Sequence, residues 1–562
     1  VIGQRELRRW TSPFQVAARR RDNPPMPENT PWWRHAVVYQ VYVRSFADGN
    51  GDGTGDIAGL RSRLPYLRSL GVDAIWVNPW YESPLNDGGY DVADYREIHP
   101  QFGTLEEAKL LIEDANQAGI RVLVDLVPNH TSNEHRWFEA ALAAGPGSSE
   151  RDRYHFLPGR GEHGELPPND WKSVFGGPAW TKVPDDEWYL HLFDTSQPDL
   201  NWSNQDVREE FDGCPRYGRD RGAAGFRVDV PPARVKPPAY PDVGEDYDRH
   251  HELSTGAESP MWDRDGLHEI VRRWRSVLDE YDDTVMIAEA WVPSWDRLSL
   301  YLRPDEYHQA FDFHFLGSEW DPSRISSRIK QAVEKAGSVG AVPTWVLSNH
   351  DVVRHATRYA LPNGIDSKHW LLDGDRSILD TDRGHRRARA AALLMLALPG
   401  SVYLYQGEEL GLPEVHELPT DVLDDPVWER SGHSEKGRDG CRVPIPWSKD
   451  GSSFGFGEGG SWLPQPEWWG DYAVEAQDGI PGSTLELYRD AMRLRDEHLR
   501  DAGDLTWLDD GDAVLSFQKG DIRCMVNFGD PIGLPDGEVL LASEPSDEGR
   551  LPTDAAVWIK TA

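Results

Sequence analysis

Three acidic residues stand at the ends of short apolar segments and could act together on one ligand. Asp229 falls in "GFRVDV", Glu289 follows "TVMIA", and Asp351 follows "TWVLSNH". One acidic residue in such a place is usually a surface charge or a helix cap. If the segments are parallel strands of one barrel, their carboxyl ends meet at one rim. Three carboxylates at one rim indicate acid–base or nucleophilic chemistry.

Arg227 stands two residues before Asp229, so on a strand both side chains would share one face. We expect the cation to lower the pKa of the Asp229 carboxyl and to keep it ionised, as a nucleophile requires. The apolar segment before Glu289 predicts desolvation, which would raise its pKa and suits a general acid. Retaining glycoside hydrolysis uses such a pair, with the carboxyls about 5 Å apart.

Eight short apolar segments alternate with helical patterns and would position these acids. The expected strands are residues 36–43, 73–78, 120–127, 225–230, 284–291, 310–315, 344–349 and 401–406. Their near-continuous apolar character indicates burial on both faces, as in a parallel sheet. Over residues 104–119, Thr104 and Glu107 predict a capping box at the start of a helix. The alternation predicts an α/β fold built on a closed (β/α)8 TIM barrel.

Two long segments and the chain's ends fall outside this alternation. We expect residues 31–130 and 191–502 to form the barrel and residues 131–190 to form a small insertion domain after the third strand. Alternating short runs from residue 503 predict a C-terminal antiparallel β-domain over 503–562. Residues 1–30, which are rich in arginine and proline, are expected to be a disordered extension.

Composition excludes some classes of partner. The 562 residues carry a net charge of −36, which argues against binding to nucleic acid or to an anionic membrane. Three widely spaced cysteines cannot all pair and lack metal-ligand spacing, which favours a reducing compartment. There is no apolar run of membrane-spanning length and no convincing secretory signal. We therefore expect a cytoplasmic protein.

Five segments, in order and spacing, resemble motifs of the α-amylase superfamily of glycoside hydrolases. Four look like its general motifs, and the fifth looks like the motif of its oligo-1,6-glucosidase/α-glucosidase branch: "DLVPNH" (125–130), "GFRVDV" (225–230), "IAEAW" (287–291), "SNHD" (348–351) and "QPDLNW" (197–202). The resemblance covers roughly residues 31–500. It implies a barrel with an insertion after the third strand and a C-terminal β-domain.

The resemblance implies roles for individual residues. Asp229 would be the nucleophile, Glu289 the acid/base, and Asp351 the acid that binds and distorts the sugar. A second group would surround the glucose, with His130 and His350 on its hydroxyls, Asp91 and Arg442 gripping its non-reducing end, Tyr90 stacking on it, Arg227 beside the nucleophile, and Phe175, Phe193 and Gln197 in the pocket wall. For the last three, a place in the core is the alternative.

A loop rich in aspartate and glycine predicts a metal site. "DGNGDGTGD" (48–56) offers oxygen ligands at Asp48, Asn50, Asp52, the Thr54 carbonyl and Asp56, like the first nine positions of an EF-hand loop. The terminal bidentate glutamate is absent, so a plain turn is the alternative. The branch that the chain resembles carries a calcium loop here. We expect a structural Ca²⁺ and no organic cofactor.

Two neighbouring segments depart from the family pattern. In "FDGCPRYGRDRG" (211–222), Gly213, Pro215 and Gly218 are expected to break the helix that relatives carry there. Both this segment and residues 231–234 keep their length but change character. Compensating frameshifts in the gene, or in its reading, are one hypothesis for this.

The second departure directly follows the nucleophile. Pro231 and Pro232 replace residues that are often small and then polar in relatives, although Lys236 keeps the family register. Proline restricts the residue before it to extended geometry, which we expect Val230 to adopt at a strand's end. In the resembling branch, valine at this position tends to accompany α-1,6 action. The linkage is left open between α-1,6 and α-1,4.

Three functions remain open from the sequence. The first is a retaining, exo-acting α-glucosidase that hydrolyses short α-glucosides (maltose, isomaltose or sucrose-like) from the non-reducing end. The second is an α-glucosyl transferase or isomerase of the sucrose isomerase or trehalose synthase type. The third is a non-catalytic homologue like a transporter heavy chain, which the three retained acids and the absence of a membrane segment disfavour.

Overall fold

The computed structural model describes residues 30–244, 259–500, 502–546 and 549–561. The expected extension at residues 1–30 lies outside this description, apart from Thr30.

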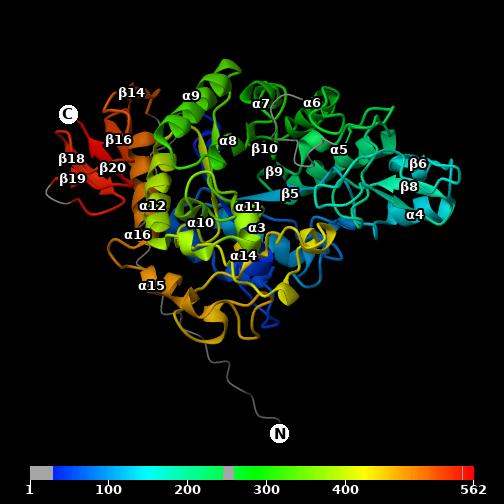
Figure 1. Cartoon of the computed structure of the whole chain (residues 1–562), viewed down its shortest axis with the longest axis horizontal. Helices are drawn as coiled ribbons and strands as arrows, with labels where there is room; N and C mark the ends of the chain where they lie inside the picture. The colour runs from blue at the N-terminus through cyan, green and yellow to red at the C-terminus, as the bar shows by residue number, and fades with distance from the viewer. Residues whose placement is uncertain (1–29, 245–258, 501, 547–548, 562) are drawn as a thin grey trace, which may run out of the picture. The chain divides into compact units, whose positions relative to one another are not determined.

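Eight parallel strands form the central sheet (Figure 1). They are β1 (Val37–Val41), β2 (Ala74–Val77), β5 (Arg121–Leu126), β9 (Gly225–Val228), β10 (Val285–Ala288), β11 (Gln309–Ala310), β12 (Thr344–Val346) and β13 (Ser401–Tyr405). The hydrogen-bonded order β11-β10-β9-β5-β2-β1-β13-β12 follows the chain around a ring. A parallel bridge between Phe311 and Thr344 joins the two ends of this order. The predicted (β/α)8 barrel is therefore confirmed.

One predicted strand is much shorter than expected. β11 ends at Ala310, and Phe313–Leu316 forms the short helix α8 instead of continuing the strand. Asp312 caps this helix, because its carboxylate accepts a hydrogen bond from the Phe315 N–H at 3.0 Å. The local cap outweighs the strand preference of the aromatic residues.

Helices follow most of the strands. They are α1 (Ile57–Ser62), α2 (Leu64–Leu70), α3 (Leu105–Gln117), α4 (Arg136–Ala144), α5 (Gln205–Arg219), α6 (Leu267–Leu278), α7 (Trp295–Tyr301), α9 (Pro322–Ser338), α10 (His355–Ala360), α11 (Ser367–Asp373), α12 (Thr381–Ala397), α13 (Pro426–Arg430), α14 (Asp439–Arg442), α15 (Val474–Gln477) and α16 (Thr484–Leu494). The capping box predicted at the start of α3 is present, since Thr104 and Glu107 bond reciprocally.

Helix α5 runs without a break through the segment that was expected to interrupt it. It spans Gln205–Arg219 and includes Pro215, so the prediction of a broken helix was wrong. Phe211 is fully buried against the barrel, and Gly218 lets the Phe226 ring approach: a Cβ at Gly218 would lie 2.8 Å from that ring. Tertiary packing therefore outweighs the roughly 3 kcal/mol that an interior proline costs a helix. A cavity of about 50 Å³ remains beneath this part of α5.

The segment between β5 and α5 has a small sheet and core of its own. Its three antiparallel strands are ordered β6 (Phe156–Pro158), β8 (Glu187–Leu190) and β7 (Trp180–Lys182). Trp171 and Trp180 form its core together with Trp262, which comes from the chain after β9. Residues from this insertion are thereby held beside the carboxyl end of β9.

The C-terminal segment forms antiparallel sheets, as predicted. Five strands are ordered β14 (Thr506–Leu508), β15 (Val514–Lys519), β16 (Ile522–Asn527), β20 (Ala555–Lys560) and β18 (Glu538–Ala542), and two short ones, β17 (Ile532–Gly533) and β19 (Arg550–Leu551), pair separately. β20 packs on α12 (Figure 1). There the Trp558 indole donates to the Leu393 carbonyl at 3.1 Å. A further two-stranded sheet pairs β3 (Tyr81–Glu82) with β4 (Asp94–Ile98).

Two sequence expectations concern the chain as a whole. Cys214, Cys441 and Cys524 are all buried and unpaired. Within the described residues, no helix combines the length and apolar character needed to cross a bilayer. The predicted compartment stays a prediction.

Candidate active site

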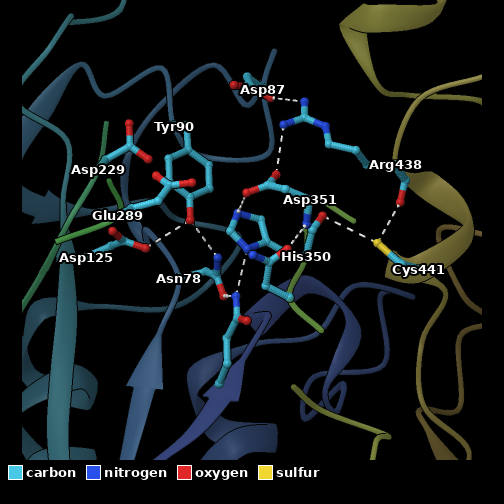
Figure 2. Close-up of polar contacts among 12 residues, drawn as sticks. Asn78, Asp87, Tyr90, Asp125, Asp229, Glu289, His350, Asp351, Arg438 and Cys441 are labelled. Carbon is cyan, nitrogen blue, oxygen red and sulfur yellow. Dashed lines mark hydrogen bonds and ion pairs between the residues drawn. The ribbon is translucent and has the colours of Figure 1, made fainter. Parts of the chain in front are cut away.

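A cavity of about 630 Å³ opens at the carboxyl ends of the barrel strands, and all three predicted acids line it. Asp229 is the first residue after β9, Glu289 is the first residue after β10, and Asp351 lies five residues beyond β12. The parallel direction of these strands brings the three carboxylates to one rim, although they are far apart in the sequence. Figure 2 shows Asp229 and Glu289 near each other and Asp351 across the site.

A single arginine connects the two carboxylates that were predicted to react. Arg227 Nη1 donates to Asp229 Oδ1 at 2.9 Å and to Asp125 Oδ1 at 2.8 Å. Its Nη2 lies 2.6 Å from Glu289 Oε2. The planar guanidinium thus bridges Asp229 and Glu289, and it can only donate hydrogen bonds. Arg227 is buried behind both acids and is not among the residues that line the cavity.

Burial raises the pKa of both bridged carboxyls. For Asp229 burial is the largest cause, and Glu289, Asp125 and Asp351 add to it, while Arg227 opposes it. Arg227 does lower the pKa of Asp229, as expected. The net shift is nevertheless upward, so the expectation of a low Asp229 pKa is wrong. Burial also raises the pKa of Glu289, as expected. Two carboxyls that interact this closely titrate as a pair, so their apparent pKa values belong to the pair and not to either residue.

Val230 adopts a conformation that the sequence did not predict. Its backbone is left-handed, with φ 38° and ψ 53°, and Pro231–Ala233 forms a short 3-10 helix directly after it. The expected extended geometry is therefore wrong. A positive φ is costly for a β-branched residue. This conformation directs the Val230 N–H to Glu289 Oε2, at 3.2 Å.

Two arginine donors and a nearby histidine surround the Asp351 carboxylate. Its Oδ1 accepts from Arg438 Nη1 at 3.0 Å and from Arg442 Nη2 at 3.2 Å. Its Oδ2 lies 3.2 Å from His350 Nε2. These neighbours lower the pKa of Asp351 well below its usual range against the opposing effect of burial. Asp351 therefore stays ionised, in contrast with the pair on Arg227.

The cavity end expected to hold Asp91 and Arg442 is formed by two other residues. Asp87 and Arg438 line the cavity and form an ion pair at 2.7 Å (Figure 2). The Asp91 carboxylate is fully buried and accepts the backbone N–H of Asp87 at 3.2 Å and the Ser83 hydroxyl at 2.9 Å. Arg442 reaches Asp351 from behind and donates Nε to the His350 carbonyl at 3.0 Å. The expected pair thus supports the cavity wall but does not form its surface.

Choosing between these residues needed more than the motif. Two aspartates flank Tyr90 in "DGGYD", and two arginines stand four residues apart in "RDGCR". The one usable signal is the glycine pair at Gly88 and Gly89, whose φ values of 59° and 106° define a tight turn. Asp87 stands directly before this turn and lines the cavity.

The predicted histidines and Tyr90 lie together on one wall. The Tyr90 and His350 rings stack with centroids 5.2 Å apart and planes 5° from parallel. His130 Nε2 lies 3.1 Å from the Tyr90 carbonyl and 3.2 Å from Gln197 Nε2. Gln197 itself lies behind the wall and donates to Asp87 Oδ2 at 2.9 Å. Burial lowers the pKa of His130 to about 4, so this ring is neutral at ordinary pH.

Aromatic side chains continue this wall, since the Phe193 and His130 ring centroids lie 5.3 Å apart. Phe175 and Phe193 both line the cavity, with their rings 5.5 Å apart and edge to face. Sequence reasoning did not find four further aromatic lining residues, which are Trp262, Trp291, Trp320 and Tyr359. The Trp291 indole donates to Glu289 Oε1 at 3.2 Å, so it also fixes the acid. Beyond Asp351 the cavity continues between residues 316–320 and 362–368.

The predicted metal loop is closed by its own hydrogen bonds. Asp48 accepts the Gly51 and Gly53 amides at 2.6 and 2.9 Å, and Asp56 caps α1 by accepting from Gly59 at 2.6 Å. Asp52 accepts the Thr54 amide at 2.8 Å. Among the described residues, no group of three or more acidic, histidine or cysteine side chains is gathered closely enough to hold a metal. The atoms that the loop offers as metal ligands are all oxygens, which Ca²⁺ prefers.

The barrel, the inserted segment and the paired carboxylates at its rim define a glycoside hydrolase of the TIM-barrel class. The "Alpha amylase, catalytic domain" family matches residues 40–502, and a domain of unknown function, DUF3459, matches residues 500–558. The chain therefore belongs to the α-amylase family, as the sequence motifs indicated.

Curated and solved relatives agree with this membership. A "Probable alpha-glucosidase" of Rhizobium meliloti (strain 1021) is 35% identical over 89% of this chain and 90% of its own length. An "Oligo-1,6-glucosidase" of Parageobacillus thermoglucosidasius is 34% identical over 83% of this chain and 84% of its own. The solved structure of an α-glucosyl transfer enzyme is 32% identical, covers 95% of this chain and 100% of its own, and has a TM-score of 0.83. The trehalulose synthase MutB of Pseudomonas mesoacidophila MX-45 is 28% identical, covers 94% and 99%, and has a TM-score of 0.82.

Proposed function

We propose that this protein is a retaining, exo-acting α-glucosidase that hydrolyses short α-glucosides, such as maltose, isomaltose or a sucrose-like disaccharide. The observation that carries the proposal is the Arg227 guanidinium, which bridges Asp229 and Glu289 at 2.9 and 2.6 Å. Adjacent donors of one planar group hold the two carboxylates close together. A retaining pair needs such closeness, about 5 Å, whereas an inverting pair stands farther apart to admit a water molecule.

In this proposal the two acids divide the chemistry. Asp229 attacks the anomeric carbon while the bond to the leaving oxygen breaks, and Glu289 gives its proton to that oxygen. Water then cleaves the glucosyl ester on Asp229 and returns a proton to Glu289. The pair needs one proton in the resting enzyme, and the raised pKa of each carboxyl favours keeping a proton on the pair.

Exo action follows from the closed end of the cavity. The ion pair between Asp87 and Arg438 would bind the terminal hydroxyls of one glucose. Arg438 is itself fixed by Asp351 and Asp425, at 3.0 and 2.6 Å, so this wall is rigid. A wall there leaves room for one sugar before the cleaved bond, and glucose would leave from the non-reducing end.

Product analysis tests the proposal. The purified protein is incubated with maltose, isomaltose, sucrose and trehalose, and with soluble starch, and sugars are followed by chromatography. Release of glucose from at least one disaccharide, without shortening of starch from within, is expected. Asp229→Asn serves as the inactive control, and Asp282→Asn, at an exposed position, serves as its matched control. Internal cleavage of starch would contradict exo action.

Glucosyl transfer is a second candidate. It is supported by the printed names of two similar solved structures, an α-glucosyl transfer enzyme and a trehalulose synthase. It is also supported by the cavity beyond Asp351, between residues 316–320 and 362–368, which offers space for an acceptor sugar. A product longer than the substrate, or an isomer of sucrose, formed faster than free glucose would establish transfer as the main reaction.

The calcium loop remains a proposal as well. Ca²⁺ would be held by Asp48, Asn50, Asp52, the Thr54 carbonyl and Asp56, and the oxygen-only donor set supports this. Binding would take Asp48 and Asp56 oxygens away from loop amides. The ion would have a structural role, away from the reacting acids. Thermal unfolding after chelation, with Ca²⁺ or Mg²⁺ added back, tests the proposal. An unchanged Tm would contradict it.

A further inference from the structure

A continuous chain of polar contacts runs from Asp125 through buried side chains to Asp351 at the cavity surface (Figure 2). Its links are Asp125 Oδ2 to the Tyr90 hydroxyl at 2.9 Å, that hydroxyl to Asn78 Nδ2 at 2.7 Å, Asn78 Oδ1 to Gln40 Nε2 at 3.0 Å, Gln40 Nε2 to His350 Nδ1 at 2.7 Å, and His350 Nε2 to Asp351 Oδ2 at 3.2 Å. Two of these residues, Gln40 and Asn78, have no role in the reaction as described above.

The direction of the first links is fixed by groups that can only donate. Arg227 donates to one oxygen of Asp125, and the Trp76 indole donates to the other at 3.0 Å. Burial raises the pKa of Asp125 to about 6, so at pH 7.5 the ionised carboxylate accepts from every partner and the Tyr90 hydroxyl must give it its single proton. The same hydroxyl can then only accept from Asn78. The amide NH₂ of Asn78 therefore faces Tyr90.

The remaining links follow in the same direction. With its NH₂ on Tyr90, Asn78 turns its carbonyl oxygen toward Gln40, which must donate through Nε2. That nitrogen carries a second hydrogen, which points to His350 Nδ1 at 2.7 Å. The Nδ1 atom must accept this hydrogen bond, so the ring proton lies on Nε2. That proton is then on the ring atom that lies 3.2 Å from Asp351 Oδ2.

We propose that Gln40 is a positioning residue that holds His350 as the neutral tautomer with its proton on Nε2, aimed at Asp351. The inference rests on the proposed function, since Asp351 and His350 are expected to bind the sugar. Gln40 lies on β1, outside the motifs that carry the family resemblance, and it touches neither substrate nor reacting acids.

The charges around His350 agree with a neutral ring. Arg442, Arg227 and Arg438 each oppose a positive charge on it, whereas Asp351 favours one. The faces of the ring are covered by Tyr42 and Tyr90, both with a pKa raised by burial and therefore neutral. The pKa of His350 is lowered well below its usual range, with burial as the largest cause.

Nitrogen NMR of the native protein tests the inference without reference to activity. Histidine is labelled with ¹⁵N, and the His350 signals are assigned by their loss in His350→Gln. At pH 7.5 the shifts and couplings are expected to report a proton on Nε2 and a lone pair on Nδ1. A proton on Nδ1, or a doubly protonated ring, would overturn the proposal. Inactivity toward every α-glucoside would sink the proposed function instead and would leave this result standing.

A matched pair of variants tests the role of Gln40. Gln40→Glu and Asn78→Asp each place one carboxyl group in the same network with little change in shape. Only Gln40→Glu puts an acceptor against His350 Nδ1, which draws the ring proton to Nδ1 and leaves Nε2 unprotonated toward Asp351 at high pH. We expect the alkaline limb of the kcat/KM profile to fall by about one pH unit or more in Gln40→Glu. In Asn78→Asp the limb is expected to stay in place.

Equal shifts in both variants would mean that any added carboxyl acts through general electrostatics, and this would overturn the positioning role. An unchanged profile in Gln40→Glu would overturn it as well. Thermal unfolding of both variants verifies that they fold. If Gln40→Glu does not fold, the tautomer of the native ring decides the inference by itself.

Discussion

The Val230 backbone N–H donates to the Glu289 carboxylate at 3.2 Å from a left-handed conformation. This hydrogen bond opposes the effect of burial on the Glu289 pKa. The conformation itself costs about 1–3 kcal/mol in a residue other than glycine. Pro231 and Pro232 follow directly, and their fixed φ angles stiffen the turn. The unusual "VPP" sequence thus holds a donor on the predicted acid.

The strain at Val230 can be separated from its side chain. Val230→Ala keeps the left-handed cost and loses packing, whereas Val230→Gly removes the cost at the expense of a more flexible unfolded chain. We expect the free energy of unfolding of Val230→Gly to equal or exceed that of Val230→Ala, while its kcat falls roughly tenfold as the N–H loses its fixed direction. Denaturant unfolding and steady-state kinetics measure both. A clearly more stable alanine variant would show that the position is unstrained.

Val230 also bears on linkage preference. Val230→Thr keeps the shape, the branching and the strained backbone and exchanges one methyl group for a hydroxyl beside the leaving sugar. We expect the ratio of kcat/KM for maltose to that for isomaltose to rise by roughly tenfold, the lower end of what one such group is worth. An unchanged ratio would show that Val230 does not set the preference between α-1,4 and α-1,6 linkages.

Substitutions of Asp87 and Asp91 are expected to have opposite effects on activity and on stability. Asp87→Asn removes a charge from the cavity surface and is expected to lower kcat/KM for maltose by roughly 10–100-fold, with little change in Tm. Asp91→Asn takes an acceptor from Ser83 and from loop amides, so Tm should fall more than activity. Kinetics and thermal unfolding of the pair decide between them. Greater loss of activity in Asp91→Asn at unchanged Tm would restore Asp91 as the residue that grips the sugar.

A buried carboxyl outside the site makes stability depend on pH. Glu408 follows β13 and accepts the Tyr405 amide at 3.0 Å, and burial raises its pKa to about 8. The folded state therefore binds a proton that the unfolded state has lost, so this group's contribution falls as pH rises from about 4.5 to 8. Glu408→Gln should gain stability relative to the parent on the order of 1–3 kcal/mol from pH 5 to pH 8. Glu334→Gln, exposed on α9, is the matched control. A constant difference across pH would contradict the assignment.

The barrel could be predicted because its signals are local. Apolar runs of strand length and a capping box such as Thr104–Glu107 depend on neighbouring residues alone, and the three acids follow from where those runs end. The continuation of α5 through Pro215 could not be predicted in this way. The penalty of an interior proline is local. It is offset by tertiary contacts, which are the burial of Phe211 and the close approach of Phe226 to Gly218.

The finer geometry of the site was also beyond the sequence. The rule that a residue before proline is extended fails at Val230, because the turn after β9 is held by packing and by Glu289. Spacing could not tell Asp87 from Asp91, since both flank Tyr90. Both atypical segments form regular elements: residues 211–222 lie mostly in α5, and residues 231–234 lie in a short 3-10 turn. A frameshift in the gene or in its reading is therefore not needed to explain their fold.

The central claim is that Asp229 forms a covalent bond to glucose while Glu289 supplies the proton. Glu289→Gln is incubated with α-glucosyl fluoride, whose leaving group needs no acid, and the protein is digested and analysed by mass spectrometry. Without a base to activate water, the glucosyl ester should accumulate, and the peptide that contains Asp229 should gain the mass of one glucosyl unit. The double variant with Asp229→Asn should gain none. A glucosyl group on another residue, or fluoride release with no adduct at Asp229, would contradict the account.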